Sequence, residues 1–434
     1  MSTGSRRVVV SGLGVVTPLG ADCATTWGRL IAEKSGLVRL PDDHLADIPQ
    51  FDGRPIPPGV LHGGPAPLQK LSAGTVTGEP IIDLAMHAAR EAVEDAGGSA
   101  GFDVDPYRAG VVFGTSKGGL RSFDRFVNRT GGLKSVESVG AALRSDGDDD
   151  EAGRFWQQFL SDTPALTLSE RYGFQASAHC PVAACATGLV AIQRAAEMIQ
   201  QGQCDVMIAG SSDASLLPAL QSSFHRLGVL ARNFENPATA CRPFDETREG
   251  FLVGEGAAVL ILEEAERARA RGVTPYAEWL GGMQVADTAG LTQLQDDSPA
   301  LQHLLRQLPV QCGFEWRDVS YLNLHGTGTV MNDACEAGAL TNVLGDEVER
   351  VPASSLKGSL GHLLGASGSV ETALTLLALK YQRFPGNPTL EMPFEGCRLN
   401  LIRDAYETIC PDVVVKLSLG FGGHLAAGAF RAWR

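Results

Sequence analysis

The chain has 434 residues, of which 44% are hydrophobic and 20% are charged. This length can bury a large core, and the balanced composition excludes a disordered chain. The formal net charge of −14 disfavours nucleic acid as a partner, because phosphate binding requires clustered lysine and arginine.

Short runs of valine, alanine and isoleucine alternate along the chain with segments of helical periodicity, which predicts an α/β fold. In chain order, the expected elements are strand 7–13, helix 80–96, strand 110–113, an acidic loop at 145–153, helix 185–200, strand 205–209, strand 254–263, helix 264–271, strand 320–324, helix 368–381 and strand 413–418. Glycine-rich strands begin and end both halves, so the sequence permits a duplicated architecture. We place the boundary between the halves near residue 265.

The nine cysteines form an odd number with no CxxC pair, and the nine histidines show no HExxH spacing. This usage argues against a disulfide framework and against a zinc site. The N-terminus runs from two arginines into a strand-like valine segment, which does not resemble a signal peptide, and no apolar stretch is long enough to span a bilayer. We therefore expect a soluble protein of the cytoplasm.

Cys185 lies in the sequence Val-Ala-Ala-Cys-Ala-Thr-Gly-Leu, at the predicted junction between an extended segment and a helix. Small neighbours allow a sharp bend that exposes the sulfur, and the N-terminal end of the helix dipole favours the thiolate. The same turn presents backbone N–H groups to a developing oxyanion. A buried structural cysteine is the alternative interpretation.

His325 follows a predicted strand in the sequence Asn-Leu-His-Gly-Thr-Gly-Thr. A histidine where a strand breaks into glycines is exposed at the end of the sheet, where α/β proteins place functional groups. Thr327 and Thr329 are spaced to line an entry channel with hydroxyls. A hydrogen-bonded histidine in a turn is the alternative.

Lys357 and His362 lie five residues apart in a glycine-containing segment, which leads into a helix that carries Glu371. The small and apolar neighbours disfavour a solvated surface lysine. A fourth motif, Leu-Gly-Phe-Gly-Gly-His at 419–424, follows the last predicted strand, and its glycines make Phe421 suitable as a gate. A core phenylalanine at a strand terminus is the alternative.

Together and in this order, the four motifs resemble the β-ketoacyl-[acyl carrier protein] synthases, the elongating type II condensing enzymes of the thiolase superfamily. The resemblance covers nearly the whole chain and includes Val-Val-Val-Ser-Gly-Leu-Gly at 8–14, Arg-Pro-Phe-Asp at 242–245 and Phe-Leu-Val-Gly-Glu-Gly at 251–256. It implies a thiolase-like five-layered α-β-α-β-α sandwich of two similar halves. Residues 1–265 would supply the nucleophile, and residues 266–434 the two catalytic histidines and the gating loop.

The resemblance implies an acyltransferase that performs decarboxylative Claisen condensation. Cys185 would accept an acyl group from an acyl carrier protein, and His325 and His362 would bind the malonyl thioester carbonyl and stabilise the enolate. Two neutral histidines can donate hydrogen bonds there without protonating the carbon. No metal or organic cofactor is required, since the substrates would be carried on the phosphopantetheine of the carrier protein, in fatty-acid or polyketide synthesis.

Further roles follow from the same resemblance. Lys357 would hold His362 in place and help set its protonation, with Glu371 as a supporting partner. The backbone N–H groups of Cys185 and Phe421 would form the oxyanion hole, and Phe421 would gate the acyl pocket. The implied substrate-binding residues are Thr327 and Thr329, on the phosphopantetheine arm, with Lys117, Phe224, Thr292 and His424.

Several positions depart from the family pattern. Lys117 replaces the small or apolar residue usual at the far end of the acyl pocket, which either changes the acyl chain accepted or forms an interface ion pair. His424 replaces the usual Thr-Asn after the glycines, where it either alters gating or makes a structural hydrogen bond. Few basic residues remain for docking a carrier protein, and the candidates are Lys70, Arg129, Lys134 and Arg232. A specialised polyketide or lipid pathway is therefore an alternative to housekeeping fatty-acid synthesis.

Two competing functions can be weighed on the motifs. A thiolase needs a second catalytic cysteine in a Cys-Gly-Gly setting, where this chain has His424, so we reject that function. A non-catalytic chain-length factor lacks the nucleophile, whereas Cys185 and both histidines are present. A catalytic subunit that pairs with such a factor remains open, and we expect a homodimer or a heterodimer with a ketosynthase-like subunit, because family members pair through a large interface.

Overall fold

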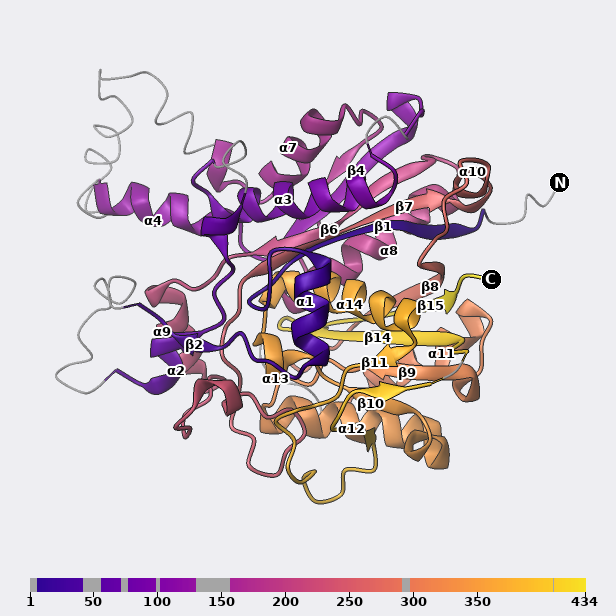
Figure 1. Ribbon diagram of the computed structural model, residues 1–434. Coiled ribbons are helices and arrows are strands. Elements are labelled where there is room, and N and C mark those ends of the chain that lie inside the picture. The colour runs from indigo at the N-terminus through magenta and orange to yellow at the C-terminus, as the bar shows by residue number, and fades with distance from the viewer. Residues whose placement is uncertain are drawn as a thin grey trace.

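The computed structural model describes residues 6–41, 56–71, 77–98, 102–129, 157–290, 297–408 and 410–434. Its central feature is a sheet with the strand order β12-β10-β9-β14-β15-β8-β1-β7-β6-β4-β5 (Figure 1). These strands are β1 (Val8–Val16), β4 (Ala109–Thr115), β5 (Ala178–His179), β6 (Val206–Asp213), β7 (Gly256–Glu264), β8 (Ala277–Ala286), β9 (Val319–Asn323), β10 (Pro352–Ser354), β12 (Asn400–Leu401), β14 (Val413–Gly420) and β15 (His424–Ala432). Two small sheets pair β2 (Val38–Arg39) with β3 (His62–Gly63), and β11 (Arg383–Phe384) with β13 (Tyr406–Glu407).

The strand order repeats between the two parts of the chain. The first part has the order β5-β4-β6-β7-β1, and the second has the order β10-β9-β14-β15-β8, so corresponding strands occupy corresponding places. The directions also repeat: β6 runs parallel to β4, as β14 does to β9. In the same way, β7 runs antiparallel to both of its neighbours, and so does β15. The two parts join where β1 pairs with β8, for example Val8 with Trp279. The duplicated architecture that the sequence permits is thus present in the strand order, whereas the boundary near residue 265, directly after β7, stays a prediction.

Helices cover both faces of this sheet and also lie between its two parts. The helices are α1 (Cys23–Ile31), α2 (Pro58–Leu61), α3 (Pro80–Asp95), α4 (Leu120–Arg129), α7 (Thr163–Tyr172), α8 (Thr187–Gln200), α9 (Pro218–Leu227), α10 (Ala265–Ala270), α11 (Pro299–Cys312), α12 (Val330–Leu344), α13 (Lys357–Leu360) and α14 (Ser367–Tyr381). Single 3₁₀ segments are η1 (Leu68–Lys70), η3 (Pro106–Arg108), η4 (Ala184–Ala186), η5 (Pro237–Thr239), η6 (Trp316–Asp318), η7 (Gly345–Glu349) and η8 (Leu364–Ala366). None of these described helices is both long enough and apolar enough to cross a bilayer.

The layers follow from which helices pack on which strands. Helices α3 and α7 pack on the outer face of the first part, α11 and α12 lie on the outer face of the second part, and α8 and α14 fill the space between (Figure 1). Every residue of α14 from Ser367 to Leu379 is buried, as expected for a helix enclosed on all sides. The outer packing is equally close, because a Cβ on Gly14 of β1 would lie 1.9 Å from the carbonyl oxygen of Ala88 in α3. This arrangement is the expected five-layered sandwich.

The expected elements are present with shifted ends, and one expectation is wrong. Each predicted strand and helix has an observed counterpart, except that the acidic loop at 145–153 lies outside the described residues. The motif at 419–424 does not follow the last strand, since it connects β14 to a further strand, β15. The reason is that β14 and β15 form a tight hairpin, with Gly420 paired to His424, and the glycines belong to its turn. This hairpin fixes Phe421 next to the central helices.

Candidate active site

Cys185 lies in η4, the single 3₁₀ turn that precedes α8. The preceding residue, Ala184, has a φ of +47°, a left-handed conformation that is strained for alanine. Thr187 stabilises this bend, because its Oγ1 accepts a hydrogen bond from Ala183 N–H at 2.9 Å and donates one to the Ala184 carbonyl at 2.7 Å. The bend places the Cys185 side chain in the wall of a cavity at the start of the helix.

The same turn occurs a second time, in η8 before α14. Leu364 has a φ of +49°, like the residue before Cys185, and the residue that corresponds to Cys185 is Gly365. An added Cβ on Gly365 would lie 2.8 Å from Ser116 Cβ, so this position has no room for a side chain. The fold therefore carries two copies of the turn and a nucleophile in only one.

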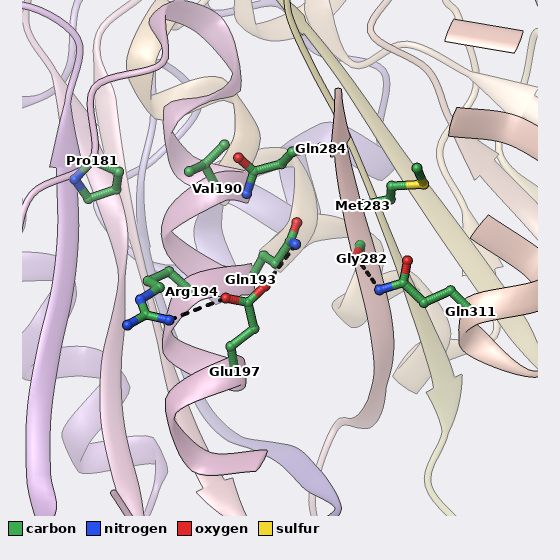
Figure 2. Close-up of a pocket in the computed structure, with 9 residues that line it drawn as sticks. All are labelled: Pro181, Val190, Gln193, Arg194, Glu197, Gly282, Met283, Gln284 and Gln311. Atoms are coloured by element: carbon green, nitrogen blue, oxygen red, sulfur yellow. Dashed lines mark hydrogen bonds and ion pairs between the residues drawn. The ribbon is translucent and has the colours of Figure 1, made fainter. Parts of the chain in front are cut away.

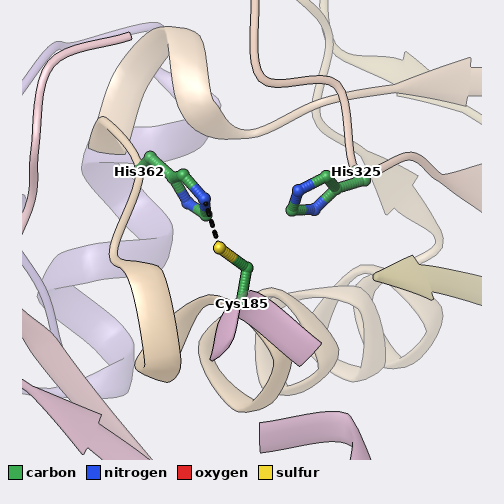
Figure 3. A group of neighbouring side chains, drawn as sticks. All are labelled: Cys185, His325 and His362. Carbon is green, nitrogen blue, oxygen red and sulfur yellow. Dashed lines mark hydrogen bonds between the residues drawn. The ribbon is translucent and has the colours of Figure 1, made fainter. Parts of the chain in front are cut away.

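Two histidines from the second part of the chain face the sulfur (Figure 3). His362 Nε2 lies 3.1 Å from Cys185 Sγ, and His362 Nδ1 lies 2.9 Å from Ser367 Oγ. The His325 and His362 rings have centroids 5.3 Å apart and an interplanar angle of 78°. One donor atom from each of Cys185, His325 and His362 lies within 4.8 Å of the others. This set could also bind Zn²⁺, but a metal there would occupy the sulfur and prevent its attack on a carbonyl.

The protonation of these groups follows from their burial. Burial raises the pKa of the Cys185 thiol to about 11, although the nearby Lys117 and Lys357 charges oppose the rise. Desolvation of the sulfur therefore opposes the helix dipole, which favours the thiolate, and it is the larger effect. Burial and then the Lys357 charge lower the pKa of His325 and His362 well below the ordinary histidine value. Both imidazoles are therefore neutral near pH 7, and His362 can accept the thiol proton.

Lys357 is fully buried and makes a different contact from the one that the resemblance implies. Its Nζ donates to the carbonyl oxygen of His325 at 2.5 Å and pairs with Glu371 at 2.7 Å. The hydrogen bond of Lys357 therefore holds His325, and the ring of His362 is held by Ser367 instead. The physical reason is that α13 begins beside the end of β9, so the lysine reaches the backbone there. Its charge still lowers the pKa of His362, as the resemblance implies.

Sequence reasoning missed two buried charged residues near His325, which are Glu336 and Lys416. Glu336 accepts hydrogen bonds from His325 N–H at 2.6 Å and from Gly326 N–H at 2.8 Å. Lys416 pairs with the second carboxylate oxygen of Glu371 at 2.5 Å. The signal that could have found Lys416 is its place inside the apolar strand 413–419, where a charge requires a partner.

The cavity beside Cys185 has a volume of about 570 Å³ and contains most of the predicted substrate-binding residues. Its lining includes Lys117, Phe224, Thr327, Thr329 and Phe421, together with the three residues of Figure 3. The backbone N–H of Phe421 lies close enough to the Cys185 sulfur to lower the pKa of the thiol.

Two predicted substrate-binding residues do not lie in this wall. His424 begins β15, is exposed and does not belong to the cavity lining, because the hairpin turns its side chain to the surface. Thr292 lies outside the described residues. The contact of Thr292 with substrate stays a prediction, and the structure gives no support to the contact of His424 with substrate.

Lys117 forms an ion pair within the chain. Its Nζ lies 3.2 Å from Asp213 Oδ2, and it also donates to Ser116, which in turn donates to Asp213. The Asp213 side chain is 3% exposed, whereas the Lys117 side chain is 25% exposed and borders the cavity. Lys117 is the charge that most strongly lowers the pKa of Cys185, so it lies near the reacting sulfur.

The residues expected to dock a carrier protein are only partly described. Lys70 ends η1 and is exposed, and Arg232 is exposed between α9 and η5. Arg129 ends α4, and Lys134 lies outside the described residues. The docking surface therefore stays a prediction.

A second hollow lies between α8 and β8 (Figure 2). Several of its polar groups bind one another: Glu197 accepts from Gln193 Nε2 at 3.0 Å and pairs with Arg194 at 3.4 Å, and Gln311 Nε2 donates to the Gly282 carbonyl at 3.1 Å. None of its lining residues is a candidate nucleophile with an adjacent base. We therefore assign the chemistry to the cavity beside Cys185.

Comparison with known proteins agrees with this geometry. The family model of the beta-ketoacyl synthase N-terminal domain matches residues 5–268, and that of the C-terminal domain matches residues 276–391. A 3-oxoacyl-[acyl-carrier-protein] synthase 2 of Rhizobium meliloti is 31% identical, over 99% of both chains. The tetracenomycin polyketide synthase ketoacyl synthase alpha subunit of Streptomyces glaucescens is 31% identical, over 97% of this chain and 96% of that one. A solved type II polyketide ketosynthase, in complex with its acyl-carrier protein and bound to a hexaketide, superposes with a TM-score of 0.87 at 29% identity, over 99% of this chain and 100% of that one.

Proposed function

Because this chain belongs to the β-ketoacyl synthase family, we propose that it condenses an acyl group with a malonyl group by decarboxylative Claisen chemistry and so acts as an acyltransferase. The observation that carries the proposal is a thiol at a helix start, 3.1 Å from one neutral imidazole, with a second imidazole beside it. The family models span both the part that carries Cys185 and the part that carries the histidines. We also propose that the chain divides near residue 265 into these two functional halves.

The first proposed step loads the enzyme. Cys185 Sγ attacks the carbonyl carbon of an acyl thioester while its proton passes to His362 Nε2, and the carrier thiol leaves with a proton. The charge on the carbonyl oxygen is stabilised by the backbone N–H groups of Cys185 and Phe421. The support for this is the N–H of Phe421 beside the sulfur and the close approach of the hairpin, since a Cβ on Gly420 would lie 3.1 Å from Cys185 N. Covalent capture divides the reaction into two easier steps.

The second step forms the carbon–carbon bond. The malonyl thioester loses CO₂, and the electron pair of the broken bond becomes an enolate, whose oxygen accepts hydrogen bonds from His325 and His362. The enolate carbon attacks the acyl carbonyl on Cys185, and the carbon–sulfur bond breaks to release the β-ketoacyl product and the Cys185 thiolate. The thiolate then takes up one proton from water, which restores the thiol. Two neutral imidazoles suit this step, because each donates a hydrogen bond through its N–H, whereas a more acidic imidazolium could transfer its proton to the enolate carbon. We propose that neither step requires a metal or an organic cofactor.

The proposed partners follow from the relatives. A solved relative holds its acyl-carrier protein, so we propose a carrier protein as the donor of both substrates here. The name of the Streptomyces glaucescens relative marks it as an alpha subunit, which supports a heterodimer with a ketosynthase-like partner as the alternative to a homodimer. None of the nine cysteines forms a disulfide, which supports action in the reducing cytoplasm.

The test is a reconstituted condensation. We expect the parent protein, given acyl-carrier and malonyl-carrier thioesters, to gain the mass of one acyl group on Cys185 and to release β-ketoacyl-carrier product. Cys185→Ala should lose both signals, whereas Cys204→Ala, which removes another buried free thiol away from the cavity, should keep them. A parent protein that is never acylated at Cys185 would contradict the proposal.

We further propose that Lys117 restricts the acyl group that Cys185 accepts. Its ammonium borders a cavity whose other walls include Phe224, Leu227 and Phe251, so a long saturated chain would have to bury a charge. Lys117→Ile should extend the range of chain lengths loaded onto Cys185, measured by mass spectrometry over a series of acyl thioesters. An unchanged chain-length profile would reject this role.

A further inference from the structure

The strand that leads into the Phe421 hairpin carries a lysine in its middle. Lys416 has apolar neighbours on both sides in β14 and is 0% exposed. A buried lysine is costly unless it is paired and hydrogen-bonded, so its partners decide its role. Those partners lie directly behind His325.

Lys416 and Lys357 make matching contacts with one carboxylate. Lys416 Nζ lies 2.5 Å from Glu371 Oε2, and Lys357 Nζ lies 2.7 Å from Glu371 Oε1. Each lysine also donates to a backbone carbonyl at the end of β9: Lys416 to Leu324 at 3.3 Å and Lys357 to His325 at 2.5 Å. Two consecutive carbonyls are therefore held by two lysines that share Glu371.

The opposite side of the same backbone is held by Glu336 of α12. Its two oxygens accept from the N–H groups of His325 and Gly326. The two lysines and two glutamates are each 0% exposed, and the cluster contains as many acidic as basic side chains. Four separate elements, α12, α13, α14 and β14, thus fix the backbone that presents His325.

We propose that Lys416 is a positioning residue, which fixes His325 through Leu324 and Glu371 and keeps this histidine neutral while the malonyl group loses CO₂. This inference rests on the proposed condensation. Lys357 alone would leave one carbonyl and one carboxylate oxygen of this cluster without their present partner. Lys416 therefore serves the half-reaction that uses His325. His362, the base in the loading of Cys185, is held by Ser367, and the Lys416 charge acts on its pKa less than the charges of Lys357 and Lys117 do.

The charge of Lys416 acts on several neighbours. It lowers the pKa of His325 and of His362 and opposes the rise of the Glu336 pKa, which burial raises to about 7. Burial in turn lowers the pKa of Lys416 to about 8. Lys357 and Glu371 complete the cluster, and the titratable groups packed around it are Asp333 and Tyr321, together with the two histidines. Loss of the Lys416 charge favours protonation of Glu336, which then no longer accepts from both backbone N–H groups.

The experiment separates the two half-reactions in Lys416→Met and Lys416→Gln. The glutamine keeps a donor without the charge, so it tests the proposal even where the methionine variant does not fold. We expect both variants to load Cys185 from an acyl thioester within about twofold of the parent, and to decarboxylate malonyl-carrier thioester at least tenfold more slowly at pH 7. We also expect the acid limb of decarboxylation to move to higher pH, a shift that a purely structural defect does not produce.

The matched control is Ser418→Ala, two residues farther along the same strand. Ser418 is 0% exposed and its Oγ has no hydrogen-bond partner in the described part of the chain. This variant should leave both half-reactions and the pH profile as in the parent. Equal losses of loading and decarboxylation in the Lys416 variants, or no loss in either, would overturn the role of Lys416. A parent protein that performs neither half-reaction would instead overturn the proposed function.

Discussion

Replacing Ser367 with alanine tests how His362 receives the thiol proton. The substitution removes the hydroxyl 2.9 Å from His362 Nδ1, and both side chains are only 1% exposed, so water does not take its place. A buried polar atom left without its partner costs about 1–3 kcal/mol. If the imidazole loses that much of its productive orientation, the loading of Cys185 slows about 5- to 160-fold.

The assay is single-turnover loading of Cys185 from an acyl thioester at pH 7, in which the gain in mass of the intact protein is measured over time. The matched control is Ser369→Ala, on the same helix, whose Oγ lies 2.6 Å from Ser211 Oγ. Both variants should lose a similar free energy of unfolding in urea, but only Ser367→Ala should load slowly. The reasoning is refuted if Ser367→Ala loads at the parent rate, or if both variants slow equally.

Three further predictions concern the Cys185 thiol, the hairpin of β14 and β15, and the ion pairs of Asp205 just before β6. Because burial raises the pKa of Cys185 to about 11, its alkylation by iodoacetamide should accelerate steadily from pH 7 to pH 10, and a plateau reached by pH 7 would contradict this. Gly420→Ala should slow loading and cost about 1–3 kcal/mol of stability, measured by urea unfolding, because its Cβ would lie 2.7 Å from the carbonyl oxygen two residues before Cys185. Hydrogen bonds from Arg108 and Arg6 lower the pKa of Asp205 from 3.8 to about 2, so the pairing stabilises the fold above pH 4 and is lost as the pH falls towards 2. Asp205→Asn should therefore cost about 2 kcal/mol at pH 7 and almost nothing at pH 2, and a cost that does not depend on pH would contradict the assignment.

The sequence predicts the parts of the site that depend on local geometry. Cys185, His325 and His362 each lie where a strand or turn meets glycines or small residues, and this pattern places a side chain at the end of a sheet whatever the rest of the fold does. The structure brings these three together from segments 140 to 177 residues apart in the chain, counting from 185 to 325 and to 362. The alternation of strands and helices likewise predicted the layered fold.

The parts that the sequence does not reveal depend on long-range contacts or on burial. Lys416 and Glu336 acquire their roles only because β14 and α12 meet behind His325, and no spacing in the sequence encodes that contact. The resemblance implies that Lys357 holds His362 and helps to set its protonation, whereas its hydrogen bond goes to the backbone of His325 and only its charge acts on His362. The pKa of Cys185 shows the effect of burial, because a helix start suggests a thiolate and only the enclosing side chains reveal the opposite.

The repeated turn before α14 bears on how many acyl groups each chain can accept. The backbone N–H of Gly365, which corresponds to that of Cys185, already donates to Asp213 at 3.1 Å, so the second turn binds a carboxylate of its own chain. That contact ties the end of β6 to the start of α14 and links the two parts of the molecule. Of the two turns only the one before α8 carries an acceptor, so titration with excess acyl donor should saturate at one equivalent for every chain, however the chains associate.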